Sequence, residues 1–213
     1  EGGKRTVLGL HDTGERLSLF GLTNGSDQGL LYRLRAIDKN GDVLAAPDTD
    51  FGLGPWAQKQ FQPQELRDVL GVQGEDDFRI EITKVSGGGY FPYVDLIRLG
   101  TEDPSFFSAN VVERDRVYLL CGSSTPGFNN SLFQSDVLLS NPTQQQMTVD
   151  VTYRNVGPSS TALPTQTLTL MPNETLRVDN LLTELFGLSN NVGILTFESD
   201  GISGVYPMLQ GET

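Results

Sequence analysis

The sequence predicts an all-β chain: two tandem β-sandwich domains of the same topology, each with one short helix. Three observations support this fold class. Short segments alternate apolar and polar residues with a period of two, which is the pattern of half-buried strands. Turns are frequent, since the 213 residues include 24 glycines and 11 prolines. Sequence landmarks also recur in the same order in the two halves, which indicates duplicated structural units.

Four short landmarks of the first half recur in the second half, each after 115 to 117 positions. In chain order, the matched segments are 22–24 (LTN) with 139–141 (LSN), 54–55 (GP) with 171–172 (MP), 70–72 (LGV) with 186–188 (FGL), and 90–93 (YFPY) with 205–208 (VYPM). Four landmarks in one order with a drift of two positions predict an internal duplication. We therefore expect domains at residues 1–108 and 109–213.

The first strands of each copy follow from alternation and turn signals. Leading strands are predicted at 4–10 and 116–121, and second strands at 16–22 and 132–139, which end at Asn-Gly and Asn-Pro turns. Third strands are predicted at 30–38 and 147–154. In the latter, Val149, Val151 and Tyr153 share one face, and the residues between them share the other. Residues 38–42 (DKNGD) predict a hairpin loop.

The middle of each copy combines a proline turn with the single non-β element. Residues 165–170 and 174–178 flank the Pro172 turn and predict a short strand pair, as at Pro55. Residues 63–71 then begin with proline, have helical apolar spacing and end in glycine, which predicts about two turns of helix. Residues 179–187 repeat this design, with Asp179 as the candidate N-cap.

Each copy closes with two more strands. They are predicted at 78–83 and 90–96 in the first copy, joined by the triple glycine 87–89, and at 193–197 and 202–209 in the second. The domain boundary is expected at or just after 101–105 (TEDPS). About seven strands in each copy of about 105 residues suit an immunoglobulin-like sandwich.

Composition excludes several function classes. The net charge of −12 and the pI of about 4.4 argue against binding to nucleic acid or to an anionic membrane surface. No stretch approaches transmembrane length, so membrane insertion is not expected. Cys121 is the only cysteine, which rules out an intrachain disulfide, and its apolar neighbours predict a buried thiol. Because the sequence begins at Glu1, we expect a processed or excised product.

Two candidate catalytic features are weak. His11 is the only histidine and lies in the turn His11-Asp12-Thr13-Gly14, where we expect a solvated side chain without a catalytic role. Asp12-Thr13-Gly14 matches the aspartic-protease signature, but that chemistry needs a second carboxylate from the other half. The matching region 123–127 (SSTPG) contains no aspartate. We therefore predict no active site, and no cofactor.

Acidic loops leave a weak possibility of calcium binding. No segment has EF-hand spacing, and turn carboxylates are the favoured interpretation. The candidate ligands are Asp48, Asp50, Glu75, Asp76, Asp77, Glu198 and Asp200.

Exposed aromatics could instead form a sugar platform, although core packing explains most aromatics in such a fold. Those candidates are Trp56, Tyr90, Phe106 and Phe107. Glycosylation sequons begin at Asn24, Asn129 and Asn173.

The chain resembles a repeat found in secreted and cell-surface proteins of bacteria. The resemblance is carried by turns and caps, and the matching segments are 133–142, 170–173, 179–187 and 193–197, together with 54–55, 93–95 and 101–104 in the first copy. Glu102 and Asn173 depart from the pattern, which has glycine at both positions. The resemblance implies an extracellular setting and a β-sandwich, and it implies no catalytic residues.

These observations lead to one main hypothesis and one alternative. The main hypothesis is a non-enzymatic extracellular structural or interaction module, a subunit of a surface assembly or filament whose protein partners include copies of itself. Its candidate donated or edge-pairing strand is the apolar start, with Thr6, Val7, Leu8 and Leu10. The alternative is a carbohydrate-binding accessory module of a larger secreted enzyme. A hydrolase would need a cleft that unites His11, or two carboxylates, with a nucleophile.

Overall fold

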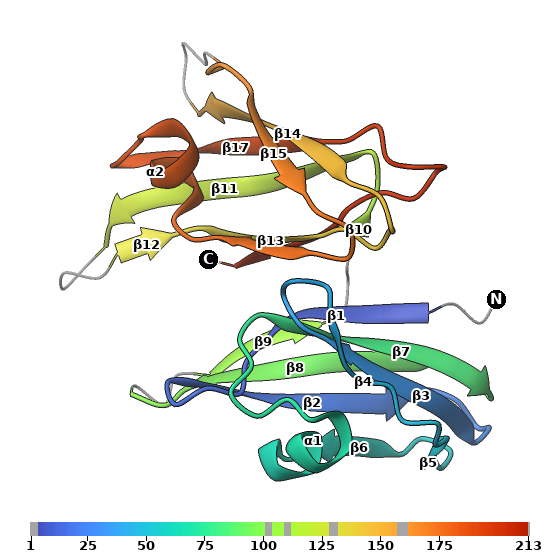
Figure 1. Cartoon of the computed structure of the whole chain (residues 1–213). Coiled ribbons are helices and arrows are strands. Elements are labelled where there is room, and N and C mark those ends of the chain that lie inside the picture. The colour runs from blue at the N-terminus through green and yellow to red at the C-terminus, as the bar shows by residue number, and fades with distance from the viewer. Residues whose placement is uncertain (1–3, 101–103, 109–111, 128–131, 157–161, 213) are drawn as a thin grey trace. The chain divides into compact units, whose positions relative to one another are not determined.

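The structure is a computed structural model that describes residues 4–100, 104–108, 112–127, 132–156 and 162–212 (Figure 1). The chain divides into two compact units, Glu1–Val111 and Val112–Thr213. Both consist mainly of β-strands, with one short helix each, so the all-β prediction is confirmed. Among the described residues, no helix is long and apolar enough to cross a membrane.

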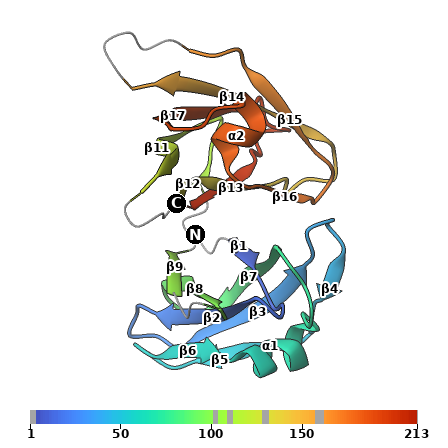
Figure 2. The ribbon, with the colours of Figure 1, turned by 90° about the vertical axis from the view of Figure 1, so that its left-hand side faces the viewer.

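Unit 1 contains two antiparallel sheets (Figures 1 and 2). The first has the strand order β1 (Lys4–Leu10), β7 (Phe78–Ser86), β3 (Leu30–Ile37), β4 (Val43–Ala45), with β5 (Phe51–Leu53) also paired to β3. The second has the order β6 (Gln58–Phe61), β2 (Arg16–Asn24), β8 (Tyr90–Arg98), β9 (Pro104–Ser108). Helix α1 (Pro63–Leu70) connects β6 to β7. Buried side chains from both sheets and from α1 form one core.

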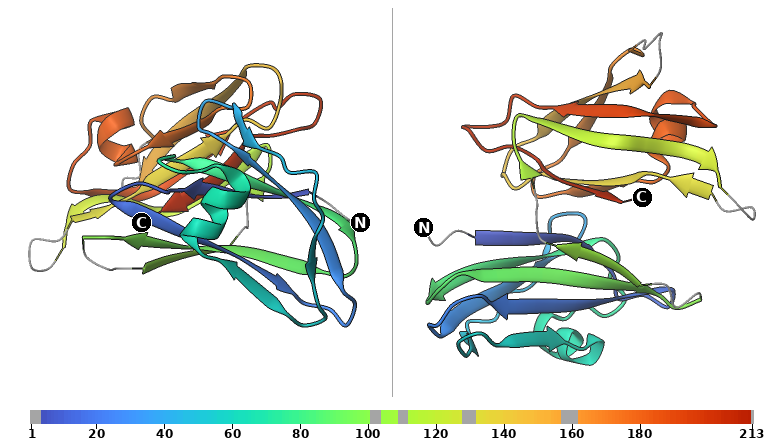
Figure 3. Two further views of the ribbon diagram at one scale, coloured as in Figure 1. Left: turned by 60° about the horizontal axis from the view of Figure 1, so that its bottom comes forward. Right: turned by 180° about the vertical axis from the view of Figure 1, so that it is seen from behind.

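Unit 2 also contains two antiparallel sheets (Figure 3). The first has the order β12 (Leu132–Gln134), β11 (Arg116–Pro126), β17 (Asn191–Glu198), β14 (Met147–Asn155), β15 (Gln166–Leu170). The second has the order β10 (Val112–Glu113), β18 (Met208–Glu212), β13 (Asp136–Ser140), β16 (Thr175–Val178). Helix α2 (Leu181–Phe186) connects β16 to β17. Val149, Val151 and Tyr153 lie in the core, on one face of β14 as the alternation predicts.

Strand order and register correspond between the units. The order β1-β7-β3 matches β11-β17-β14, and β6-β2-β8 matches β16-β13-β18. Phe20 lies opposite Phe61 and Val94, and the residue 117 positions later, Val137, lies opposite Val178 and Gly211. Both helices end at a glycine with left-handed backbone, at φ 62° and 64°. The first three sequence landmarks therefore fall on equivalent structural positions.

The fourth landmark was matched two residues out of register. Pro92 lies opposite Leu22, and the residue opposite Leu139 is Leu209, not Pro207. The reason is that the predicted strand 202–209 is a strand only from Met208, because Ile202 and Val205 close a tight turn through an isolated bridge. A shared proline in two unrelated local contexts produced the wrong alignment.

Pairing of the outer strands differs from the immunoglobulin pattern. In that fold, the first strand joins the sheet of the second, and the last strand joins the sheet of the sixth. Here β1 pairs with β7, and β8 pairs with β2, so β1 and β8 have exchanged sheets relative to the first and last immunoglobulin strands. The short β1–β2 turn carries the chain from one sheet directly into the other. The turn between β7 and β8 does the same.

Three local predictions were wrong. The predicted strand 132–139 breaks at Ser135 into β12 and β13, which lie in different sheets. The backbone N–H of Ser135 donates to the carbonyl of Ser123 (2.9 Å), and its Oγ accepts from the N–H of Ser123 (2.9 Å), which fixes the break. Strands β15 and β16 likewise enter different sheets rather than pairing. The N-cap of α2 is Asn180, while Asp179 lies 3.5 Å from Arg177.

Candidate functional site

His11 lies at the end of β1, in a cluster with two adjacent carboxylates. Its ring Nδ1 is hydrogen-bonded to Oδ1 of Asp76, and its Nε2 lies 3.6 Å from Oδ1 of Asp77. The residue is 1% exposed, so the prediction of a solvated turn histidine is wrong. The backbone of this turn is folded inward, which carries the ring with it.

Backbone hydrogen bonds build this cluster from two segments that are distant in sequence. The N–H of His11 donates to Oγ of Ser18 (2.8 Å), and the N–H of Ser18 donates to the carbonyl of His11 (2.8 Å). The N–H of Asp12 donates to the carbonyl of Glu75 (2.8 Å), and that of Gly74 to the carbonyl of Asp12 (2.9 Å). The β1–β2 turn and the α1–β7 loop are thereby joined, which brings Asp76 and Asp77 beside His11.

Asp12 is part of a separate ion pair rather than a protease-like pair of carboxylates. Its two carboxylate oxygens accept from Nε (2.7 Å) and Nη2 (2.8 Å) of Arg67 on α1. This hydrogen bond and the charge of Asp12 raise the pKa of the Arg67 guanidinium. Because the pairing is bidentate and Asp12 is buried, it fixes the helix to the turn.

Asp76 makes unit 1 sensitive to acid. Partial burial opposes ionisation of Asp76, but the hydrogen bond and charge of His11 outweigh it and lower the pKa below its ordinary value of 3.8. A lowered pKa in the folded state stabilises the fold above about pH 4, and this stabilisation is lost as the pH falls through the lowered pKa. The unfolding midpoint of the parent chain should therefore fall as the pH is lowered below about 4. We expect this fall to be smaller in the Asp76→Asn variant. An equal fall in both would contradict the assignment.

The cluster fits an imidazole held between carboxylates better than it fits a metal centre. One ligand atom from each of His11, Asp76 and Asp77 lies within 4.8 Å of the others. However, the two carboxylates face opposite nitrogens of one ring. A histidine binds a metal through one nitrogen, so a shared ion would require Asp76 or Asp77 to move to the other side of the ring.

Removal of metal therefore provides a direct test of this cluster. We expect the unfolding midpoint of the parent chain to be the same with and without EDTA. We also expect zinc to raise the midpoint of the parent chain by no more than it raises the midpoint of the His11→Asn variant. A zinc-dependent rise in the parent chain that His11→Asn abolishes would reassign the cluster as a metal centre.

The other acidic candidates are dispersed. Asp50 accepts from Nε of Arg33 (2.5 Å), and Asp48 lies 3.5 Å from the same guanidinium. Glu198, in unit 2, is paired with Arg116. Within the described residues, the only group of three or more potential metal ligands is the His11 cluster.

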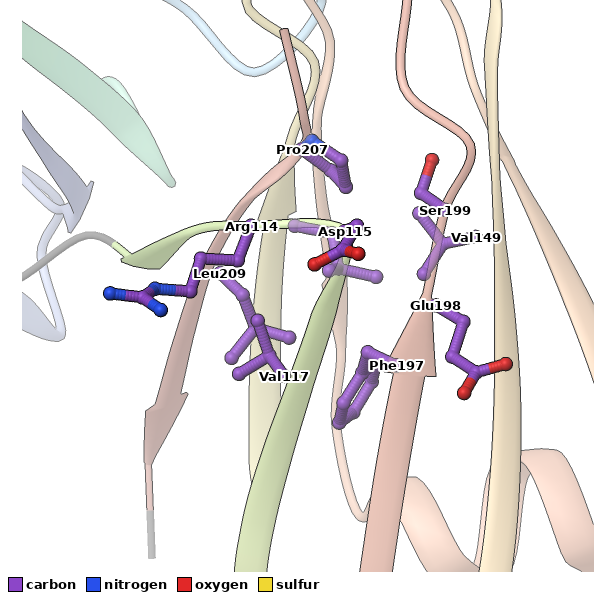
Figure 4. Close-up of a pocket in the computed structure, with 10 residues that line it drawn as sticks. Arg114, Asp115, Val117, Val149, Phe197, Glu198, Ser199, Pro207 and Leu209 are labelled. Atoms are coloured by element: carbon purple, nitrogen blue, oxygen red, sulfur yellow. The ribbon is translucent and has the colours of Figure 1, made fainter. Parts of the chain in front are cut away.

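A shallow hollow opens at one end of unit 2 (Figure 4). Val117, Phe197, Leu209 and Pro207 line its apolar part, with Asp115 and Glu198 nearby. It has room for about one water molecule, too little for an organic substrate.

The correspondence of strand register between the units accounts for the hollow. Pro207 and Val149, another lining residue, occupy the positions equivalent to Tyr90 and Tyr32, 117 residues earlier. In unit 1, both tyrosine rings fill the core, and the Tyr90 hydroxyl donates to the carbonyl of Ile82 (3.2 Å). Burial also raises the pKa of Tyr32 to about 12. The hollow is thus the space left by two smaller side chains.

The remaining sequence candidates are spread over the molecule. Trp56 is exposed. Tyr90 is a core residue, so the prediction that it contributes to an exposed sugar platform is wrong. The side chains of Phe106, Phe107 and Cys121 lie outside those described, as does the sequon at Asn129. Asn24 is fully buried, so its sequon is inaccessible in the folded protein, while Asn173 is half-buried in the β15–β16 turn.

No protein-family model matches the chain, and no curated protein matches it significantly. The assignment of a role therefore depends on the residues and geometry described above.

Proposed function

We propose that this chain is a non-enzymatic structural or interaction module that binds protein partners, including copies of itself, by strand pairing at its sheet edges. The observation that supports this most is the position of β1. It pairs with β7 from Lys4 to Leu10, and no strand among the described residues lies on its other side. An open edge presents backbone donors and acceptors to which an extended strand can add.

The placement of β1 favours an edge-pairing role over a donated strand. Val7 and Leu10 are part of the unit 1 core, so donating this strand to a neighbour would empty that core. Thr6, which precedes Val7, and Leu8, which lies between Val7 and Leu10, are buried as well. Lys4 forms an ion pair with Glu81 on β7 (2.6 Å), which also holds the strand in its own sheet. Partners would therefore add alongside β1.

The finer description of the fold is part of the same proposal. The two units are tandem copies of one sandwich topology, immunoglobulin-like in the number and alternation of strands but not in the pairing of the first and last ones. Matching strand orders, registers and helix ends support this. The resemblance to secreted and cell-surface bacterial repeats supports an extracellular or cell-surface location.

Self-association can be measured directly. We expect sedimentation velocity to show a reversible rise in mass with concentration, and hydrogen exchange to show slower exchange of first-strand amides at high concentration. The physical reason is that new ladder hydrogen bonds protect edge amides that are otherwise open to water. A chain that stays monomeric at millimolar concentration, with unchanged hydrogen exchange in β1 and β11, would contradict self-association.

The carbohydrate-binding alternative makes a different prediction. A sugar platform needs coplanar exposed aromatics. Among the side chains that the structure describes, the exposed aromatics are Trp56, in the turn before β6, and Phe91 on β8 in unit 1, with Tyr118 on β11 and Phe133 on β12 in unit 2. Saturable binding to polysaccharide by a chain that does not self-associate would favour this alternative.

A further inference from the structure

We infer that a second copy of this chain docks on β11 of unit 2, through antiparallel pairing of β11 with β11 of the other copy. This inference rests on the proposed function and identifies the edge and the partner. It comes from three features of β11: an open edge, exposed apolar side chains beside it, and local charge neutrality. The candidate edge is the segment 116–120.

The edge of this segment is open along most of its length. Residues 116–119 pair with β17, from Arg116 opposite Glu198 to Leu119 opposite Leu195. On the other side of β11, β12 pairs only with Ser124 to Pro126. No described strand covers the edge at 116–120. Figure 3 shows β11 as a long strand that extends well past β12.

The side chains beside this edge are apolar and exposed. Tyr118 is 56% exposed and Leu120 is 66% exposed, while Val117 and Leu119 between them pack against the core. The same alternation puts Phe133 of β12, which is 59% exposed, farther along the same sheet. Adjacent exposed apolar residues on an open edge are what natural sheets usually avoid by placing charges there.

Strand β1 contrasts with β11 at equivalent positions. Strands β7 and β17 are equivalent in the two units. Thr6 lies opposite Glu81 of β7 and Tyr118 lies opposite Thr196 of β17, so Thr6 is equivalent to Tyr118. Both Thr6 and Leu8 are buried, so at these positions β1 exposes no large apolar side chain. Strand β11 presents backbone groups and two large apolar side chains, which is why the inference assigns self-association to unit 2.

Charge permits two identical edges to meet here in spite of the net charge of −12. Arg116 is paired with Glu198, so the segment carries little net charge. The antiparallel pair can be centred on Tyr118 or on Leu119. In either register, the apolar side chains of one copy lie opposite apolar side chains of the other copy or opposite the aliphatic part of its Arg116. In both registers, the two arginines lie at opposite ends of the pair. No like charges face each other, and the contact is self-complementary about a two-fold axis.

The size of this surface predicts a weak dimer. Five residues of ladder and two apolar side chains from each copy fall at the low end of specific interface areas. We expect a dissociation constant between about 10 µM and 1 mM, which corresponds to a transient association. Higher affinity would require further contacts outside this edge.

A substitution at the exposed apolar position is the first test. Leu120→Lys puts a charge next to the pairing edge, and we expect it to weaken dimerisation at least tenfold in sedimentation equilibrium. Val156→Lys is the matched control, because Val156 is also in unit 2, has similar exposure (64%) and lies outside this edge. It should leave dimerisation unchanged, and both variants should retain the parent circular dichroism spectrum.

A cross-linking test gives an independent readout of register. In a Cys121→Ser background, Tyr118→Cys alone should form an intermolecular disulfide under mild oxidation if the pair is centred on Tyr118. Tyr118→Cys combined with Leu120→Cys should do so if the pair is centred on Leu119, and Thr6→Cys in β1 should not form one in either case. Dimerisation that is unaffected by Leu120→Lys, together with no cross-link in either β11 cysteine variant, would overturn this inference and leave edge pairing elsewhere intact. A chain that is monomeric throughout would overturn both this inference and self-association as the proposed function.

Discussion

Replacing Asn141 with alanine is expected to lower the free energy of unfolding of unit 2 by about 2–4 kcal/mol. This side chain is fully buried. Its Nδ2 donates to the carbonyls of Gln145 (2.7 Å) and Met171 (2.9 Å), and its Oδ1 accepts from the N–H (2.9 Å) and Oγ1 (2.7 Å) of Thr143. Alanine would remove all four hydrogen bonds and take from the N–H of Thr143 the acceptor that it has here, and unpaired buried backbone groups are costly.

The duplication provides a matched substitution for this test. Asn24 in unit 1 has the same network, with donors to the carbonyls of Gln28 (2.6 Å) and Gly54 (2.8 Å) and an acceptor for Ser26. Hydrogen exchange resolved by unit should show Asn141→Ala loosening unit 2 and Asn24→Ala loosening unit 1. Asn141→Asp keeps the acceptor but places a buried carboxylate oxygen against the two carbonyl oxygens, so at neutral pH it should destabilise unit 2 at least as much as alanine does. If Asn141→Ala lowered the free energy of unfolding by less than about 1 kcal/mol, water molecules would be replacing the lost hydrogen bonds.

This network explains why part of the duplication could be predicted from sequence. The segments 22–24 and 139–141 are short, but each ends in an asparagine whose side chain must satisfy several backbone groups at once. Asparagine is suited to this because its amide both donates and accepts. The left-handed glycines Gly71 and Gly187 were predictable for a similar local reason. Residues that are required by the local backbone conformation therefore occur at equivalent positions in both units.

Strand pairing, in contrast, was not predictable from local signals. Alternation identifies a strand and its buried face, but it carries no information about which neighbour the strand pairs with. The exchange of β1 and β8 between sheets therefore had no signature in either segment. The breaks at Ser135 and before Met208 were missed for the same reason, since apolar residues continue through both places.

The His11 cluster shows the same limit for a site. His11 and Asp76 lie 65 positions apart and are joined by backbone hydrogen bonds between two irregular segments. No spacing rule connects them. The equivalent of His11 in unit 2 is Ser123, because both residues exchange backbone and Oγ hydrogen bonds with the matched serines Ser18 and Ser135. Unit 2 thus keeps this pair of hydrogen bonds without the imidazole, which indicates that the hydrogen bonds do not depend on the cluster.

Gly87→Ala is expected to destabilise unit 1 by about 3–5 kcal/mol, the largest effect predicted for a single exchange of this size. Gly87 begins the triple glycine between β7 and β8 and has φ 102°, a conformation that L-residues rarely adopt. A Cβ atom there would lie 2.0 Å from the carbonyl oxygen of Gly29 and 2.8 Å from Cα of Leu30. Both atoms belong to the backbone, so relief requires movement of the start of β3.

The same triplet contains the control. Gly89 has no positive φ, and a Cβ atom there would meet nothing within 4 Å, so Gly89→Ala should change the free energy of unfolding by less than about 1 kcal/mol. Urea unfolding of both variants, with exchange resolved by unit, measures the difference. Equal effects at the two positions would mean that chain entropy in the turn, rather than the close approach of Gly87 to β3, determines the result. A large difference confined to unit 1 would show that this turn must be glycine because the backbones touch.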